Sequence, residues 1–187
     1  MSKVLYRLLK AWLRIKGYLI SKKIISDLIV IAGIAIYILH FSKLVLFRFK
    51  TFDAYAWDLG LFNQAFIATL KYGKLFYTTV ELYVSPTGSL FAMHLSPALF
   101  LLLPFYALRP CPETLLIIQT VLLALGAIPL YALAIEKLKS RWAAVSVVIS
   151  YLLYPLMHGV NWYDFHPQAM IPLFLFTYFY FFEKKRT

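Results

Sequence analysis

Carboxylate and histidine side chains are the groups in this sequence best suited to chemistry, and most of them lie in two polar regions. Five of the eight acidic residues and three of the four histidines occupy residues 53–113 and 158–166. Carboxylates together with histidines suit a divalent cation. Their spacing matches neither the histidine pairs nor the cysteine pairs of tight zinc sites, since Cys111 is the single cysteine. The expected metal is therefore a weakly held magnesium or manganese ion.

The individual residues also have simpler interpretations. Asp58 opens an amphipathic stretch, where a carboxylate stabilises the start of a helix through the helix dipole. Asp164 and His166 flank Phe165, and either could cap the helix that follows. A functional role is favoured by the grouping of ionisable residues at the mouth of a hydrophobic bundle, where unpaired charges cost energy.

The elements that must position these residues are hydrophobic helices. Hydrophobic residues make up 62% of the chain and charged residues 14%, with a mean hydropathy of +0.75. Soluble domains use about one-quarter charged residues, so the principal solvent here is lipid. A membrane span needs about 20 apolar residues, so the length allows about four spans and one large loop. The sequence predicts an all-α, polytopic transmembrane helix bundle with amphipathic juxtamembrane helices, in the cell membrane.

The chain has a net charge of +11, and its basic residues are distributed as in a membrane protein. Nucleic acid is therefore not an expected partner. Basic residues gather before the first apolar run, at residues 3–23, in the turn at 137–141, and after the last apolar run, at 184–186. Such clusters face the cytoplasm by the positive-inside rule, and anionic lipid attracts them.

The predicted organisation is a cytoplasmic, amphipathic basic segment (1–23) followed by one membrane domain (24–187). The expected spans are 24–47, 113–135, 141–157 and 169–182. Residues 48–110 form an outer loop with surface or re-entrant helices. Within it, the segment 94–108 is too short to span and contains two prolines, and demoting it brings all three basic clusters to the cytoplasmic side.

Four short motifs in order resemble a known family. They are Trp57-Asp58-Leu59-Gly60-Leu61-Phe62-Asn63-Gln64, His94-Leu95-Ser96-Pro97, the stretch 115–131 with its Gln119 and Gly126, and Asp164-Phe165-His166-Pro167. Together, over residues 52–182, they resemble the predicted membrane proteins of the domain of unknown function family 2079. That family is similar to membrane glycosyltransferases of the GT-C type, which use lipid-linked sugar donors outside the cytoplasm.

The resemblance implies roles for particular residues. Asp58, in the first outer loop, would be the catalytic base, and Asp164, in the second, would bind metal together with His166 and His94. The expected substrate contacts are Trp57, Gln64 and Glu81. Such enzymes usually carry about twice as many spans, so the resemblance implies either an enzyme of this kind or the amino-terminal half of a GT-C bundle, in a truncated or split form.

Three functions follow from these observations. The first is a glycosyltransferase-like membrane protein that uses a polyprenyl-phosphate sugar at the extracytoplasmic face. The alternative is a non-catalytic membrane subunit or scaffold, which would associate with itself or with a partner membrane subunit. A small transporter would need ionisable groups at mid-span, and apart from His40 and Lys43 near the interface the expected spans offer almost none.

Overall fold

The computed structural model describes residues 3–54 and 56–185, with side chains from Lys23 onward except that of Ala56. The side chains that make the segment 1–23 amphipathic and basic, Lys23 excepted, and the terminal Arg186 therefore lie outside what the structure describes. Within the part described, the chain is helical with no strand, which confirms the predicted all-α class of membrane protein.

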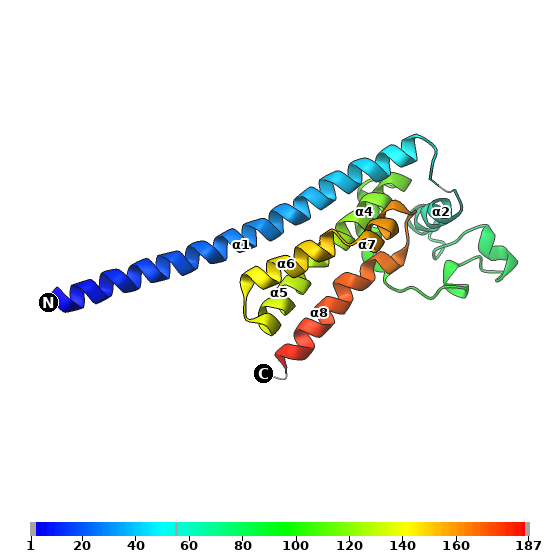
Figure 1. Ribbon diagram of the computed structural model, residues 1–187. Coiled ribbons are helices and arrows are strands. Elements are labelled where there is room, and N and C mark those ends of the chain that lie inside the picture. Colours follow the sequence, from blue (N-terminus) through cyan, green and yellow to red (C-terminus); the bar gives the residue numbers. More distant parts are fainter. Residues whose placement is uncertain (1–2, 55, 186–187) are drawn as a thin grey trace.

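Helix α1 (Lys3–Lys50) is the longest element, with 48 residues in one unbroken helix. No break separates the amphipathic segment expected at 1–23 from the apolar stretch that follows. The first part of α1 projects beyond the other helices (Figure 1). Residues Lys23–Lys50 are long and apolar enough to cross a membrane.

Helices α4 (Pro112–Leu125) and α5 (Ala127–Leu138) form the second candidate span, joined at Gly126. Helices α6 (Arg141–Leu152) and α7 (Pro155–Trp162) form a third one only if they are taken together, because they are bent by 42°. Helix α8 (Ile171–Lys184), which follows the 3-10 turn η3 (Pro167–Met170), has 14 residues.

The bend between α6 and α7 has a local cause. Tyr154 precedes Pro155, and a residue before proline is driven out of the helical region by the proline ring. Tyr154 accordingly has a ψ of 118°. The sequence predicts one span over 141–157, whereas the helix ends at Leu152 and restarts in a new direction.

The predicted outer loop folds into short helices and turns. It contains α2 (Ala56–Tyr72), the 3-10 turns η1 (Val80–Tyr83) and η2 (Leu90–Ala92), and α3 (Leu99–Leu108). The ten residues of α3 reach only about half the length of a span. The loop shares a hydrophobic core with the adjoining parts of α1 and α4, and within it Phe76 is fully buried against the rings of Phe66 and Phe91.

Two ends of the bundle differ in content (Figure 1). One end carries α2 and the loop that follows it, together with the connection from α7 to α8. The other end carries the turn between α5 and α6 and the end of α8, where Arg141 pairs with Asp27 at 2.7 Å and Lys137 pairs with Glu183. Which end faces the cytoplasm stays a prediction.

Candidate functional site

A cleft of about 300 Å³ lies at the end of the bundle that carries α2 and the long loop. Three segments far apart in sequence form its walls: the start of α2, the loop from η1 to residue 96, and the start of η3. We call it the polar cleft, and it is lined by Trp57, Asp58, Leu61, Phe62, Val80, Glu81, Val84, Met93, His94, Ser96, His166, Pro167 and Gln168. Five of the residues singled out from the sequence therefore share one cavity.

Phe165 holds the third wall in place. Its ring is fully buried and packs edge-on against Phe62 of α2 at 5.1 Å between ring centroids. The ring of the next residue, His166, also lies against Phe62, at 6.3 Å between ring centroids. The apolar residue between Asp164 and His166 therefore acts as an anchor for the motif.

Asp58 is the best-placed carboxylate of the polar cleft. It lies in the first turn of α2, where the sequence interpretation put it, and its side chain is 26% exposed. The hydroxyl of Tyr163 donates to Oδ2 at 3.2 Å, and Nε2 of His166 lies 3.9 Å from Oδ1. The carboxylate is thus held by the hydroxyl of Tyr163, has the ring of His166 nearby, and still reaches solvent.

His166 is held in a defined orientation. Its Nδ1 lies 2.9 Å from the carbonyl oxygen of Asp164, which can only accept, so Nδ1 carries a proton. Nε2 is then the ring nitrogen that lies beside Asp58. The backbone N–H of His166 donates to Oε1 of Gln119 at 2.7 Å, which fixes the residue to α4.

Glu81 has a carboxylate oxygen without a hydrogen-bond partner in the described part of the chain. The residue lies in η1, is 5% exposed, and its Oε2 is fully buried. A buried acceptor without a donor costs free energy. Glu81 therefore contributes a buried acceptor at the wall of the polar cleft.

Of the remaining predicted residues, Trp57 and His94 line the polar cleft and Gln64 does not. Trp57 has 67% of its surface exposed. Gln64 lies outside the lining, where its Oε1 accepts from the N–H and the hydroxyl of Thr79 and ties α2 to the loop.

Asp164 does not face the polar cleft. Its side chain is fully buried, and Oδ1 accepts from Nη1 of Arg48 at 3.0 Å. Nη1 of Arg48 also donates to the carbonyl oxygen of Trp162 at 2.6 Å. Arg48 thus binds the α7–η3 connection to the end of α1.

The metal set expected from the sequence, Asp164, His166 and His94, does not fit a metal ion in this arrangement. Nowhere in the described residues do three or more histidine, cysteine or acidic side chains gather as ligands. The positive guanidinium of Arg48 occupies the carboxylate of Asp164 that a cation would need.

Three residues that shape the site were not assigned to it from the sequence. Tyr163 binds Asp58, and Arg48 binds Asp164. Gln119 binds the backbone of residues 160–166. Fully buried Gln119 donates from Nε2 to the carbonyl oxygens of Val160, Tyr163 and Asp164, at 3.0, 3.3 and 3.4 Å. A lone amide in the middle of an apolar helix was the available signal for it.

Fold and site together define an all-α integral membrane protein with a polar cleft at one end of its bundle. The chain belongs to the family described as predicted membrane protein (DUF2079), whose model matches residues 48–187. The match confirms the family indicated by the four motifs, begins at Arg48, and includes all residues of the polar cleft. No curated protein and no solved structure matches the chain.

Proposed function

We propose that the polar cleft binds the sugar of a lipid-linked donor at the extracytoplasmic face, and that Asp58 is the base in its transfer to an acceptor hydroxyl. The observation that carries the proposal is the pairing of two carboxylates in one cleft. Asp58 is oriented and accessible, and Glu81 has a buried oxygen without a donor.

The chemistry of the lining supports a hydroxylated ligand. Carboxylate oxygens accept hydrogen bonds, so the side chains of Asp58 and Glu81 match a molecule rich in hydroxyl donors. The exposed Trp57 adds a broad, amphipathic surface at the wall. A sugar offers hydroxyls on its edges and an apolar face, which suits both features.

The proposed transfer is a single displacement. The acceptor oxygen forms a bond to the anomeric carbon while the bond from that carbon to the phosphate oxygen breaks. The acceptor proton passes to Asp58, and the polyprenyl phosphate leaves with the electron pair. Tyr163 and His166 position the carboxylate, and a base so placed contributes typically about 10²–10⁴-fold to the rate.

The test is sugar transfer by the chain in nanodiscs, which expose both faces. Polyprenyl-phosphate hexoses with a radiolabelled sugar are supplied, and label that becomes water-soluble or joins an added alcohol is counted. Asp58→Asn is expected to lower the rate at least about 100-fold, because an amide cannot accept the proton.

The matched control is Asp53→Asn. Asp53 lies five residues earlier, is 69% exposed, and does not line the polar cleft, so its variant is expected to retain full activity. Full activity of Asp58→Asn would remove Asp58 as the base. Failure of the unaltered chain to use any polyprenyl-phosphate hexose would overturn the proposal and favour the non-catalytic subunit.

A further inference from the structure

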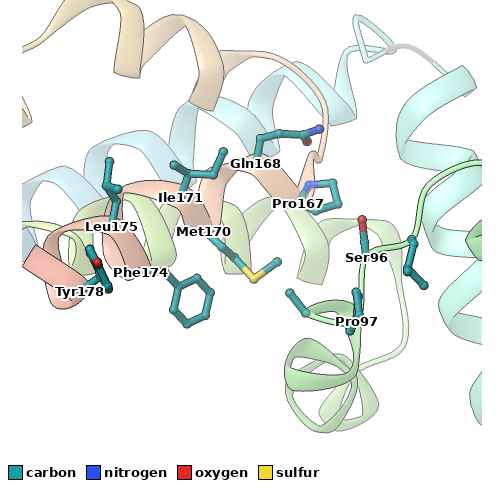
Figure 2. A pocket seen from close by; sticks show the side chains of 11 residues that line it. Ser96, Pro97, Pro167, Gln168, Met170, Ile171, Phe174, Leu175 and Tyr178 are labelled. Atoms are coloured by element: carbon teal, nitrogen blue, oxygen red, sulfur yellow. The ribbon is translucent and has the colours of Figure 1, made fainter.

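A second, larger hollow lies beside the polar cleft and is almost entirely apolar. Its volume is about 580 Å³, and it runs between α8 and the segment before α3 (Figure 2). We call it the apolar groove, and it is lined by Leu95, Ser96, Pro97, Ala98, Pro167, Gln168, Met170, Ile171, Phe174, Leu175 and Tyr178.

The polar cleft and the apolar groove adjoin each other. Ser96, Pro167 and Gln168 line both of them. Figure 2 shows these residues at one end of the groove, with the apolar side chains of α8 leading away from them. A molecule that fills both hollows must have a polar head and an apolar tail.

The length and direction of the groove suit one leaflet of a bilayer. From Gln168 to Tyr178 the helical rise amounts to about 15 Å, which is about half of a hydrocarbon core of about 30 Å. Helix α8 runs from the end with the polar cleft toward the opposite end of the bundle (Figure 1). A chain in the groove would therefore lie along the depth of the leaflet next to the cleft.

The groove is also open to a lipid from the side. Within α8, all of which is described, no side chain is buried, and Ile171, Phe174 and Tyr178 are 55%, 47% and 60% exposed. A hydrocarbon chain could enter laterally without passing through water, and apolar contact along the groove would hold it.

We propose that the apolar groove binds the hydrocarbon chain of a single lipid whose head group occupies the polar cleft. The inference rests on the proposed function for the nature of that head, a sugar on polyprenyl phosphate. Beyond that function, the groove gives the position of the isoprenoid chain and the leaflet from which the donor is taken.

The experiment is photo-crosslinking in phosphatidylcholine nanodiscs with a polyprenyl phosphate that carries a diazirine on its isoprenoid chain. Peptides are then mapped by mass spectrometry. Label is expected within residues 168–178, reduced by excess unlabelled polyprenyl phosphate and unaffected by added phosphatidylcholine. Equal labelling of α5 and α8 would overturn the proposal.

Two variants fill the groove, and one matched control does not. Ile171→Trp and Leu175→Trp place a bulky ring in the groove and are expected to lower labelling at least five-fold. Ile128→Trp is the control because Ile128 also precedes Pro-Leu, is 54% exposed against 55% for Ile171, and lines neither hollow. Unchanged labelling in both groove variants, with helicity retained by circular dichroism, would overturn the proposal.

The labelling and sugar-transfer experiments together test the lipid groove and the enzymatic activity separately. Groove labelling without any sugar transfer keeps the lipid site and removes the glycosyltransferase. Asp58-dependent transfer with labelling elsewhere removes the groove alone. A disulfide between two chains with Ile171→Cys in a Cys111→Ser background, together with loss of label, would show that a second copy covers the groove and would overturn the lipid proposal.

Discussion

The buried ion pair of Arg48 and Asp164 joins residues 116 positions apart and fixes the connection that carries His166. Asp164 is fully buried and Arg48 is 6% exposed at the side chain, so both charges have left water. Removing one partner of such a pair costs about 3–5 kcal/mol, because the other charge stays buried. The pair is therefore more important for the shape of the cleft wall than for chemistry within it.

Asp164→Asn is expected to lower the free energy of unfolding by about 3–5 kcal/mol, measured by thermal unfolding in detergent with circular dichroism. Asp53→Asn removes a carboxylate 3.6 Å from the same arginine, but Asp53 is 69% exposed. Its effect is expected to stay below about 1 kcal/mol. Equal losses in the two variants would contradict the structural role of the buried pair.

Tyr106 of α3 shows how burial sets the behaviour of one hydroxyl. Burial raises its pKa to about 12, and the protonated hydroxyl donates to Oδ1 of Asn63 in α2. In the unfolded chain a tyrosine ionises near 10. Between pH 10 and 12 the folded chain therefore keeps a proton that the unfolded chain has lost. The resulting contribution to the free energy of unfolding is complete below pH 10 and is lost as the pH rises from 10 to 12.

Replacing Tyr106 by Phe gives a test with a defined sign. The variant is expected to be less stable than the unaltered chain at pH 8 by about 1–3 kcal/mol, since Asn63 loses a donor. Between pH 10 and 12 its unfolding midpoint should fall less steeply. Parallel loss of stability in both proteins over that range would show that Tyr106 does not titrate with a raised pKa.

At the scale of elements, Gly126 permits the close approach of three helices. A methyl group there would meet the hydroxyl of Tyr151 and would lie 3.2 Å from Pro172. The hydroxyl of Tyr151 also donates to the carbonyl oxygen of Leu123 at 2.7 Å. This hydrogen bond ties α6 to the backbone at the joint between α4 and α5. The joint thus depends on the absence of a side chain.

Gly126→Ala is expected to destabilise the chain by about 1–3 kcal/mol, as overpacking does. Gly60→Ala is the control with the opposite sign: a methyl group there meets nothing within 4 Å, and alanine in a helix is favoured over glycine by about 0.5–1 kcal/mol. Unfolding midpoints of the two variants are compared. A stable Gly126→Ala chain would mean that α6 and α8 do not pack against the joint.

Local pattern predicted the elements better than it predicted their contacts. Apolar length and basic clusters indicated the helices, and Asp58 opens α2 as its sequence context implied. The role of Arg48 could not be predicted, because its partner lies far away in sequence and a lone arginine beside a loop is ordinarily exposed. For the same reason, the sequence could not show that Arg48 pairs with the carboxylate of Asp164, the residue expected to bind a metal ion.

At the scale of the whole molecule, the two ends of the bundle are chemically different. The cleft end presents Asp58, His166 and the long loop, whereas the other end presents the α5–α6 turn, with the ion pairs of Arg141 and Lys137. Positive loops are retained in the cytoplasm, so the α5–α6 turn is expected inside and the polar cleft outside. The leaflet from which the proposed lipid-linked donor is taken depends on that orientation.

Single cysteines in a Cys111→Ser background test the orientation. Gly60 and Gln168 are exposed at the cleft end, and Leu138 is 48% exposed at the other. In sealed vesicles of known orientation, a membrane-impermeant maleimide should label cysteine at 60 and 168 from the extracytoplasmic side, and cysteine at 138 only from the cytoplasmic side. If 60 and 168 label from opposite sides, the walls of the polar cleft cannot meet, and both the sugar site and its lipid groove are wrong. If all three are inverted, the cleft stands but opens to the cytoplasm, and its donor would come from the inner leaflet.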